Sequence, residues 1–399
     1  MPAEGISLPG TGDGSHRGGD PRVRRPHILD APMRIGIVAH WFNRGQGVVA
    51  RHLRSALDEL GHDTFVLARP TRATNRRPAF VDRGDVWDQP EVTEASTFAI
   101  PAAEYEQWAA GRRLDAVFFD QNYQFEEIAG LRRRGVTTLA RFVWEAFSPA
   151  DVAGAREAFD VIYSVTECEQ RRYAELGIDS PRVVWGCHPE LLAVRPEREE
   201  PPVKLFFPGG FLSKRKPIRP VLRAFADVPD ADLRLVVKAQ VPRRGDFLQE
   251  MSDRDPRIAV IRDDLPAAEH LRLFASCHVC LAPSRWEGLG LHLYEAVAFG
   301  MPIVTTDIPP MNEVVRAGFN GLLLAPRPTK HMTRSGIPAY DPDRNQLVDA
   351  IRRLADPELR AQLSAGALET RERLSWSRTV AGLRTLLETA VPVAAAGRP

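Results

Sequence analysis

The chain has 399 residues, of which 44% are hydrophobic and 26% are charged, and its formal net charge at pH 7 is +1. This composition is typical of a globular protein, and the length is sufficient for two domains with full cores. The near-neutral charge argues against a nucleic-acid partner, and no apolar run has the length of a transmembrane segment.

The first segment, residues 1–32, contains Gly, Pro, Asp, Arg and Ser without a hydrophobic period, and we predict a disordered tail. It lacks the apolar core of a signal peptide. The protein is therefore expected to be cytoplasmic.

The first predicted domain spans residues 33–194 and begins with a strand at 34–39. A helix with apolar residues at helical spacing follows and ends at Gly61, and the next strand covers 63–68. Later strands are predicted at 116–119, 138–143 and 161–165. This alternation predicts an α/β, doubly wound sheet with helices on both faces.

The loop after the first strand contains Gly45 and Gly47 and, written G-x-G-x-x-A, is similar to a dinucleotide-binding fingerprint. The spacer from His40 to Arg44 is longer than a tight Rossmann turn, and the next strand ends in Arg69-Pro70 instead of a ribose-binding carboxylate. Both observations argue against NAD(P).

Two polar residues, His40 and Glu145, follow strands of the first domain. Open α/β sheets bind ligands at the carboxyl ends of their strands, so both residues are candidates for the cleft. A structural role is the alternative for each. The run Arg132-Arg-Arg134 precedes Gly135 at a predicted helix end, where arginines favour the dipole. A weak peripheral membrane association is the alternative for this run.

A polar, proline-rich stretch at 195–202 predicts an interdomain linker, and the strand and helix alternation restarts in a second domain at 203–375. Residues 376–399 are predicted as a C-terminal helix and tail. Strands of the second domain are predicted at 203–207, 233–237, 258–261, 278–283 and 303–306. The Cys277-His-Val-Cys280 run suits buried small side chains better than zinc, because no second cysteine pair occurs.

The most informative segment is 284–295, in which Glu287 and Glu295 flank a Gly-Leu-Gly loop. A predicted strand ends just before the segment, and a helix is predicted from Leu291 to Phe299. The glycines thus lie at a helix N-terminus, where free N–H groups and the helix dipole favour a phosphate. Two carboxylates can bind hydroxyl groups on either side of this phosphate. A ligand with a phosphate between two hydroxyl-rich groups is a sugar nucleotide.

The loop 208–217, after the first strand of the second domain, contains Lys214, Arg215 and Lys216. A cation here would stabilise the charge that grows on a departing nucleoside diphosphate. A solvated basic turn is the alternative for Lys214 and Lys216.

The segment 284–295 resembles the Glu-x7-Glu element of retaining GT-B glycosyltransferases of the family-4 type, and 301–307 and 311–324 continue the pattern. The resemblance covers most of the region from 202 to 376. It implies two Rossmann-like domains facing a cleft (GT-B), with a terminal helix that crosses back to the first domain. The implied reaction moves a sugar, with retention, from a nucleoside-diphosphate sugar to a small-molecule, glycan or lipid-linked acceptor.

The resemblance also implies site residues. Lys216 and Glu287 are the implied catalytic residues, Glu287 lies near the donor sugar and Glu295 near the ribose, and Gly45 and Gly47 line the cleft. No Asp-x-Asp motif occurs where it would be needed, so neither a metal nor another cofactor is expected. The implied donor-binding residues are Gly210, Lys214, Arg215, Lys216, Glu287, Gly288, Leu289, Gly290, Leu291 and Glu295.

The chain departs from the family pattern at two positions. Phe211 stands where the family's loop has an arginine that binds the donor diphosphate, and no histidine occurs near Glu145. Either Lys214 or Arg215 supplies the second charge, or the diphosphate is held more weakly. The two departures also favour the alternative of a non-catalytic partner that kept the fold as a binding module, and a sugar-nucleotide epimerase of the same fold is a further alternative. His292, beside the glycine loop, is either a polar contact of the ligand or a helix-surface residue.

Overall fold

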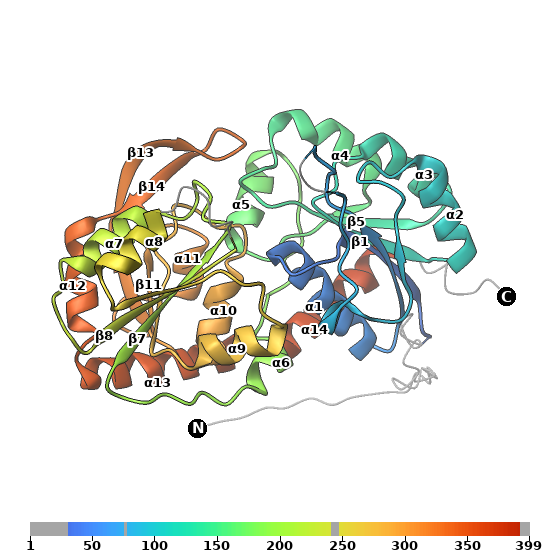
Figure 1. Cartoon of the computed structure of the whole chain (residues 1–399). Helices are drawn as coiled ribbons and strands as arrows, with labels where there is room; N and C mark the ends of the chain where they lie inside the picture. Colours follow the sequence, from blue (N-terminus) through green and yellow to red (C-terminus); the bar gives the residue numbers. More distant parts are fainter. Residues whose placement is uncertain (1–30, 76–77, 241–246, 392–399) are drawn as a thin grey trace, which may run out of the picture.

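The computed structural model describes residues 31–75, 78–240 and 247–391. Nearly all of the tail predicted at 1–32, and residues 392–399 of the predicted C-terminal segment, lie outside the described residues. The described chain forms two α/β lobes side by side, each built on one six-stranded sheet (Figure 1).

The first sheet has the strand order β3-β2-β1-β4-β5-β6, and all its neighbouring strands are parallel. Its central strands are buried on both sides, which is why they read as continuous apolar runs in the sequence. The strands are β1 (Arg34–His40), β2 (Asp63–Arg69), β3 (Val92–Glu94), β4 (Ala116–Asp120), β5 (Thr137–Arg141) and β6 (Val161–Ile162).

Helices cover both faces of this sheet, since side chains alternate between two apolar clusters along β1. Ile35 and Ile37 belong to one cluster and Val38 to the other. The helical segments of this domain are α1 (Gly45–Glu59), η2 (Asp85–Trp87), α2 (Ala102–Arg112), α3 (Phe125–Arg133), η3 (Pro149–Asp151), α4 (Val152–Ala158), α5 (Glu167–Glu175) and α6 (Pro189–Leu192).

The second sheet repeats the same topology in the order β12-β11-β10-β7-β8-β9, again with parallel neighbours. Its strands are β7 (Val203–Gly210), β8 (Leu233–Ala239), β9 (Ile258–Ile261), β10 (Val279–Leu281), β11 (Ile303–Thr306) and β12 (Gly321–Leu324). The helices that follow are α7 (Ile218–Ala226), α8 (Phe247–Arg254), α9 (Ala267–Ala275), α10 (Leu291–Ala298), α11 (Met311–Val314), α12 (Arg344–Arg353), α13 (Pro357–Arg373) and α14 (Trp376–Ala390).

The prediction of two Rossmann-like, doubly wound domains is confirmed. The sequence did not indicate the antiparallel hairpin of β13 (Pro326–Met332) and β14 (Pro338–Pro342), because β13 is polar and largely exposed and β14 begins and ends with a proline. The three-residue strand β3 was missed because it, too, is largely exposed. In Figure 1 the hairpin extends from the second lobe towards the first.

The last helix, α14, returns to the first domain and lies against α1 (Figure 1). The Trp376 indole N–H donates to the Glu59 carboxylate at 3.2 Å, and the Thr379 hydroxyl donates to the Val184 carbonyl at 2.9 Å. Within the part of the chain that the structure describes, no helix has the length and apolar content to cross a membrane.

Candidate functional site

A cavity of about 580 Å³ lies between the two domains, and both of them line it. The first domain contributes residues at the ends of β1 and β5 and the start of α1, including His40, Gly45 and Glu145. The second domain contributes residues at the ends of β7 and β8 and at the start of α10. These are the carboxyl edges of two parallel sheets, where ligands bind in this class of fold.

The N-terminus of α10 forms one wall of this cavity. Gly290, its N-cap residue, has φ 78°, a left-handed conformation that favours glycine, and no side chain caps the helix. The first N–H groups of α10 are therefore without intrahelical partners, and they carry the positive end of the helix dipole. Residues 288–292, around this N-terminus, all line the cavity.

Lys216 and Glu287 form a buried ion pair beside this N-terminus. The Lys216 ammonium lies 2.5 Å from Glu287 Oε1 and also donates to Ser284 Oγ at 3.0 Å. The Ser284 hydroxyl in turn donates to the same carboxylate oxygen at 2.7 Å. An ammonium group has three N–H donors, so one donor of Lys216 is left for a ligand.

Each member of this pair stabilises the charged form of the other. Burial alone would raise the pKa of Glu287, but Lys216 and Arg215 outweigh burial and hold that pKa well below its usual range. Burial lowers the pKa of Lys216, and the Glu287 carboxylate partly offsets the effect. The Arg215 guanidinium is 3.7 Å from Glu287 Oε2 and 3.8 Å from Glu145 Oε1.

Two other carboxyl groups in the cavity hold their protons more tightly than usual. Burial raises the pKa of Glu145 to about 7, against the opposing effect of Arg215, and burial also raises the pKa of Glu295 to about 7. Burial lowers the pKa of His292 to about 3, helped by Lys216, so this imidazole is neutral at pH 7. Near neutral pH the cavity therefore carries less negative charge than its three glutamates would suggest.

Four residues that line the cavity each have a buried polar atom without a hydrogen-bond partner among the described residues: Arg44 Nε, Arg215 Nε, Glu145 Oε2 and His292 Nε2. Unpaired buried polar atoms cost free energy, and in native proteins they are uncommon outside sites that bind a ligand or water. The two guanidinium N–H groups require acceptors, as an anion provides. The carboxylate oxygen requires a donor, as a hydroxyl group provides.

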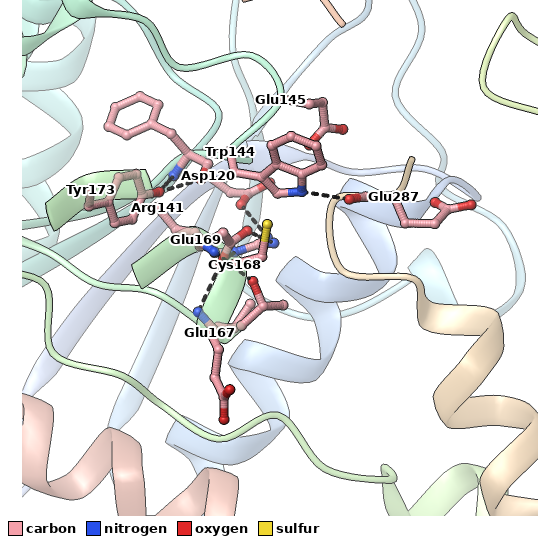
Figure 2. Close-up of polar contacts among 12 residues, drawn as sticks. Asp120, Arg141, Trp144, Glu145, Glu167, Cys168, Glu169, Tyr173 and Glu287 are labelled. Carbon is pink, nitrogen blue, oxygen red and sulfur yellow. Dashed lines mark hydrogen bonds and ion pairs between the residues drawn. The ribbon is translucent and has the colours of Figure 1, made fainter. Parts of the chain in front are cut away.

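Glu145 and its neighbour Trp144 are held by a buried network in the first domain (Figure 2). Arg141, at the end of β5, donates to Glu169 at 2.6 Å and to Asp120 at 3.2 Å. The Tyr173 hydroxyl contacts the backbone of Phe142, and the Phe142 N–H donates to that hydroxyl at 2.9 Å. These contacts fix the chain where it leaves β5 and enters the cavity.

The cavity brings together most of the residues that the sequence singled out. Two of them, Gly47 and Lys214, do not line it. Gly47 packs against the Phe42 backbone, where a Cβ would come within 2.2 Å of the Phe42 carbonyl oxygen, so it allows close packing instead of forming the cleft wall. The side chain of Lys214 is exposed, which agrees with the alternative of a solvated turn. The predicted residues that line the cavity are His40, Gly45, Glu145, Gly210, Arg215, Lys216, Glu287, Gly288, Leu289, Gly290, Leu291, His292 and Glu295. Of these, His292 is buried, so the alternative of a helix-surface residue is wrong.

Sequence reasoning missed several polar residues of the cavity, among them Arg44, Arg141, Lys238 and His270. Lys238 follows a predicted strand directly, so the rule that strand ends form ligand sites would have found it. Arg141 was placed inside a strand, and His270 lies on α9 with no motif around it. Arg44 immediately precedes the glycines of the first domain, but no pattern in the sequence indicates that its side chain contacts the second domain.

Away from the cavity, His52, His188 and Glu190 have ligand atoms close enough together to hold a metal ion. The two imidazole rings are stacked face to face, with centroids 3.9 Å apart, and Arg51 already donates to Glu190 Oε1 at 2.7 Å. The ion pair with Arg51 satisfies the carboxylate that a metal would use, so the group has a structural explanation. Cys277 and Cys280 are both buried and free, as the alternative of small buried side chains predicts.

Comparison with known proteins relates the second domain to one enzyme family. Residues 202–356 match the family glycosyl transferases group 1. The chain is 28% identical over 278 residues to D-inositol 3-phosphate glycosyltransferase 1 of Catenulispora acidiphila, covering 63% of each protein. It is 32% identical over 109 residues to the lipopolysaccharide core biosynthesis mannosyltransferase LpsB of Rhizobium meliloti, covering 26% of this chain and 31% of that protein. The chain thus spans less than two thirds of the length of these curated relatives.

Solved structures share the fold over most of the chain. Sucrose-phosphate synthase from Thermosynechococcus elongatus superposes with a TM-score of 0.67 at 17% identity, covering 90% of this chain and 98% of that one. The Anabaena protein HepE in complex with UDP superposes with a TM-score of 0.60 at 13% identity, covering 90% of this chain and all of that one. At these identities the likeness establishes the GT-B fold.

Proposed function

We propose that this chain, whose residues 202–356 match the glycosyl transferases group 1 family, is a retaining glycosyltransferase. It moves a sugar from a nucleoside-diphosphate sugar to an acceptor hydroxyl. The observation that carries the proposal is the interdomain cavity, in which an uncapped helix N-terminus and the Lys216–Glu287 pair meet four unpaired buried polar atoms. The names of the relatives support it, since they are sugar transferases, and so does the UDP bound to the Anabaena neighbour.

The donor diphosphate belongs at the N-terminus of α10. The free N–H groups there can donate hydrogen bonds to an anion, and Lys216 and Arg215 add positive charge on the same side of the cavity. The raised pKa values of Glu145 and Glu295 support this placement, because partly protonated carboxyl groups repel a diphosphate less than ionised ones do.

The two glutamates of the Glu-x7-Glu element have different surroundings that suit different parts of the donor. Glu287 Oε1 is occupied by Lys216 and Ser284, whereas Oε2 has only the distant Arg215, so Oε2 is free to accept from a sugar hydroxyl. Glu295 lies within α10, four residues and about one turn after its first residue, Leu291. We assign it to the ribose hydroxyls.

The chemistry needs positive charge at the leaving group. As the bond between the sugar C1 and the diphosphate oxygen breaks, negative charge grows on that oxygen. The Lys216 ammonium and the α10 N-terminus stabilise this charge more in the transition state than in the ground state. The acceptor oxygen bonds to C1 on the face from which the diphosphate departs, and the acceptor proton passes to the departing diphosphate oxygen. The configuration at C1 is thereby retained.

The test is a thermal-shift screen of the protein with UDP, GDP, dTDP and ADP, each for the wild type and Lys216→Ala. At 100-fold excess over the dissociation constant a ligand stabilises the folded protein by about 2.7 kcal/mol, a readily measured shift. Stabilisation by one nucleotide that is lost in the variant supports the proposal. No stabilisation by any nucleotide at saturating concentration would overturn it.

A second measurement separates the transferase from the two alternatives. The sugar nucleotide of the base found in the screen is incubated with the protein, and the products are followed by NMR. Acceptor-dependent release of the nucleoside diphosphate, with an unchanged anomeric configuration, is the expected result. Interconversion of free sugar nucleotides would identify an epimerase, and tight binding without turnover for a broad panel of acceptors would identify a binding module.

A further inference from the structure

We propose that Arg44, in the first domain, supplies the guanidinium that binds the donor diphosphate from the side opposite Lys216. Phe211, in the second domain, acts as the platform that positions this guanidinium. The inference rests on the proposed function, and it adds a donor-binding residue that reaches the site from the other domain.

The first observation is the path of the Arg44 side chain. Arg44 is the N-cap residue of α1, and its guanidinium extends across the cavity to the second domain. The guanidinium carbon lies 4.5 Å from the centre of the Phe211 ring, and Nη1 lies 3.3 Å from Asp264 Oδ1. Arg44 is thus a residue of the first domain whose charged end lies on the wall formed by β7 and the loop after it.

The second observation is the environment of Phe211. This phenylalanine follows Gly210 at the end of β7 and is 52% exposed, one of the few large apolar side chains exposed to that degree in the described chain. An aromatic ring attracts a guanidinium over its face, and the stacked arrangement leaves the N–H groups at the edge of the guanidinium free to bond elsewhere. The ring itself offers a phosphate no hydrogen-bond donor. Its exposure at the cavity is explained by the cation that it carries.

The third observation is that the bonding of the Arg44 guanidinium is incomplete. Its Nη1 contacts the Asn43 carbonyl and Asp264, and its Nη2 lies 3.5 Å from Asp264 Oδ2, whereas Nε is buried without an acceptor among the described residues. Asp264 is itself more than half exposed, so its pairing with Arg44 contributes little stability. Asp264 also accepts from the Gln240 side chain at 2.5 Å, and this bond remains if Arg44 turns to a ligand.

The fourth observation is the arrangement of the cations. Lys216 and Arg215 belong to the second domain and form ion pairs with Glu287, whereas Arg44 belongs to the first domain and, among the residues that the structure describes, forms its ion pair with the exposed Asp264. A diphosphate between them would be bonded by both domains at once. A guanidinium offers two parallel N–H groups that match two phosphate oxygens, so Arg44 suits a terminal phosphate group.

The experiment measures dissociation constants by calorimetry for three probes: the nucleoside diphosphate found in the screen, its monophosphate, and inorganic pyrophosphate. We expect Arg44→Gln to raise the dissociation constants of the nucleoside diphosphate and of pyrophosphate about 10- to 100-fold, since charge-assisted hydrogen bonds to a phosphate are lost. The dissociation constant of the nucleoside monophosphate should rise less than about threefold, because this probe lacks the terminal phosphate group that Arg44 binds. Phe211→Leu removes the ring and keeps an apolar side chain. It should lower the affinity for the nucleoside diphosphate and pyrophosphate by less than Arg44→Gln does, and again more than it lowers the affinity for the monophosphate.

A rescue variant tests the geometry. An arginine at 211 would place a guanidinium within reach of the position that Arg44 occupies, so Phe211→Arg combined with Arg44→Gln should restore diphosphate affinity to within a few-fold of the wild type. Diphosphate binding that Arg44→Gln leaves unchanged, or an equal loss for all three probes, would overturn the inference alone. A wild type that binds no nucleoside diphosphate would instead overturn the proposed function, and this inference with it.

Discussion

Trp144 of the first domain donates its indole N–H to the backbone carbonyl of Glu287 in the second domain, at 2.7 Å (Figure 2). Both residues are buried, so water does not compete for this bond. The carbonyl belongs to the residue whose carboxylate holds Lys216. This bond is therefore one of the hydrogen bonds between the domains that align the two walls of the cavity; the N–H groups of Glu167 and Cys168, for example, also donate across the domains, to the Glu313 carboxylate at 2.7 Å each.

Trp144→Phe should weaken both the fold and the site. The substitution leaves the Glu287 carbonyl buried without its partner, which costs on the order of 1–3 kcal/mol of unfolding free energy. We also expect a higher KM for the donor, because the glycine loop at 288–290 loses its tie to the first domain. Urea unfolding and donor kinetics measure the two effects.

Trp41→Phe is the matched control for this variant. The Trp41 indole also donates to a buried backbone carbonyl, that of Trp87 at 2.9 Å, but the bond lies within the first domain and Trp41 does not line the cavity. The control should lose a similar unfolding free energy and keep its KM. Equal changes in KM for both variants would show that the effect of Trp144 is general destabilisation.

Lys216→Ala should lower turnover by about 10²-fold, the typical effect of removing one group that stabilises charge in the transition state. Lys214→Ala is its control, since Lys214 is two residues away in the same basic loop but is exposed and outside the cavity. Lys214→Ala should stay within about twofold of the wild type, the range expected for an exposed charge. A loss of similar size in both variants would contradict the placement of the donor.

Glu295→Ala should lower the affinity for the nucleoside diphosphate by about tenfold and leave the affinity for inorganic pyrophosphate nearly unchanged. The reason is that Glu295 is assigned to the ribose, where losing a hydrogen bond of a charged group costs about 1.5 kcal/mol. Competitive inhibition by the two compounds, measured against the donor, gives both affinities. A parallel loss for pyrophosphate would move Glu295 from the ribose to the phosphates.

Glu145→Gln should stabilise the protein above neutral pH. The native carboxyl has a pKa of about 7, raised from 4.5 mainly by burial, so the native state binds more protons than the unfolded state between those values. Stability consequently falls as pH rises from about 4.5 to about 7, and Glu145→Gln removes that loss. We expect a gain on the order of 1–3 kcal/mol at pH 8 and little change at pH 4.5, read from urea unfolding. A gain of the same size at both pH values would contradict the raised pKa.

The sequence predicted the parts of the fold and site that depend on local patterns. The buried strands appear as short apolar runs, and the N-terminus of α10 is marked by glycines between a strand and a helix, so Glu287 and Glu295 were found. Lys216 was found because a basic loop follows β7. Local patterns contain this much because strands and helices impose fixed periods on the chain.

Contacts between residues far apart in the chain were not predictable in this way. Arg44 and Phe211 are separated by more than 160 positions, and neither residue type indicates the other. The Trp144 bond to Glu287 spans 143 positions. Lys214 and Gly47 were misplaced for a related reason: a basic turn or a glycine shows what the backbone permits, but the direction of the side chain depends on packing.

The return of α14 to the first domain means that the polypeptide passes between the domains twice, once through residues 195–202 and once just before Trp376. The second passage is tied to the first domain where it arrives there: the Cys187 N–H donates to the Leu374 carbonyl at 2.8 Å, and a Cβ on Gly186 would come within 2.5 Å of the Ser375 carbonyl oxygen. Any opening of the cavity therefore requires the chain to bend at both connections, because each of them joins the same two domains.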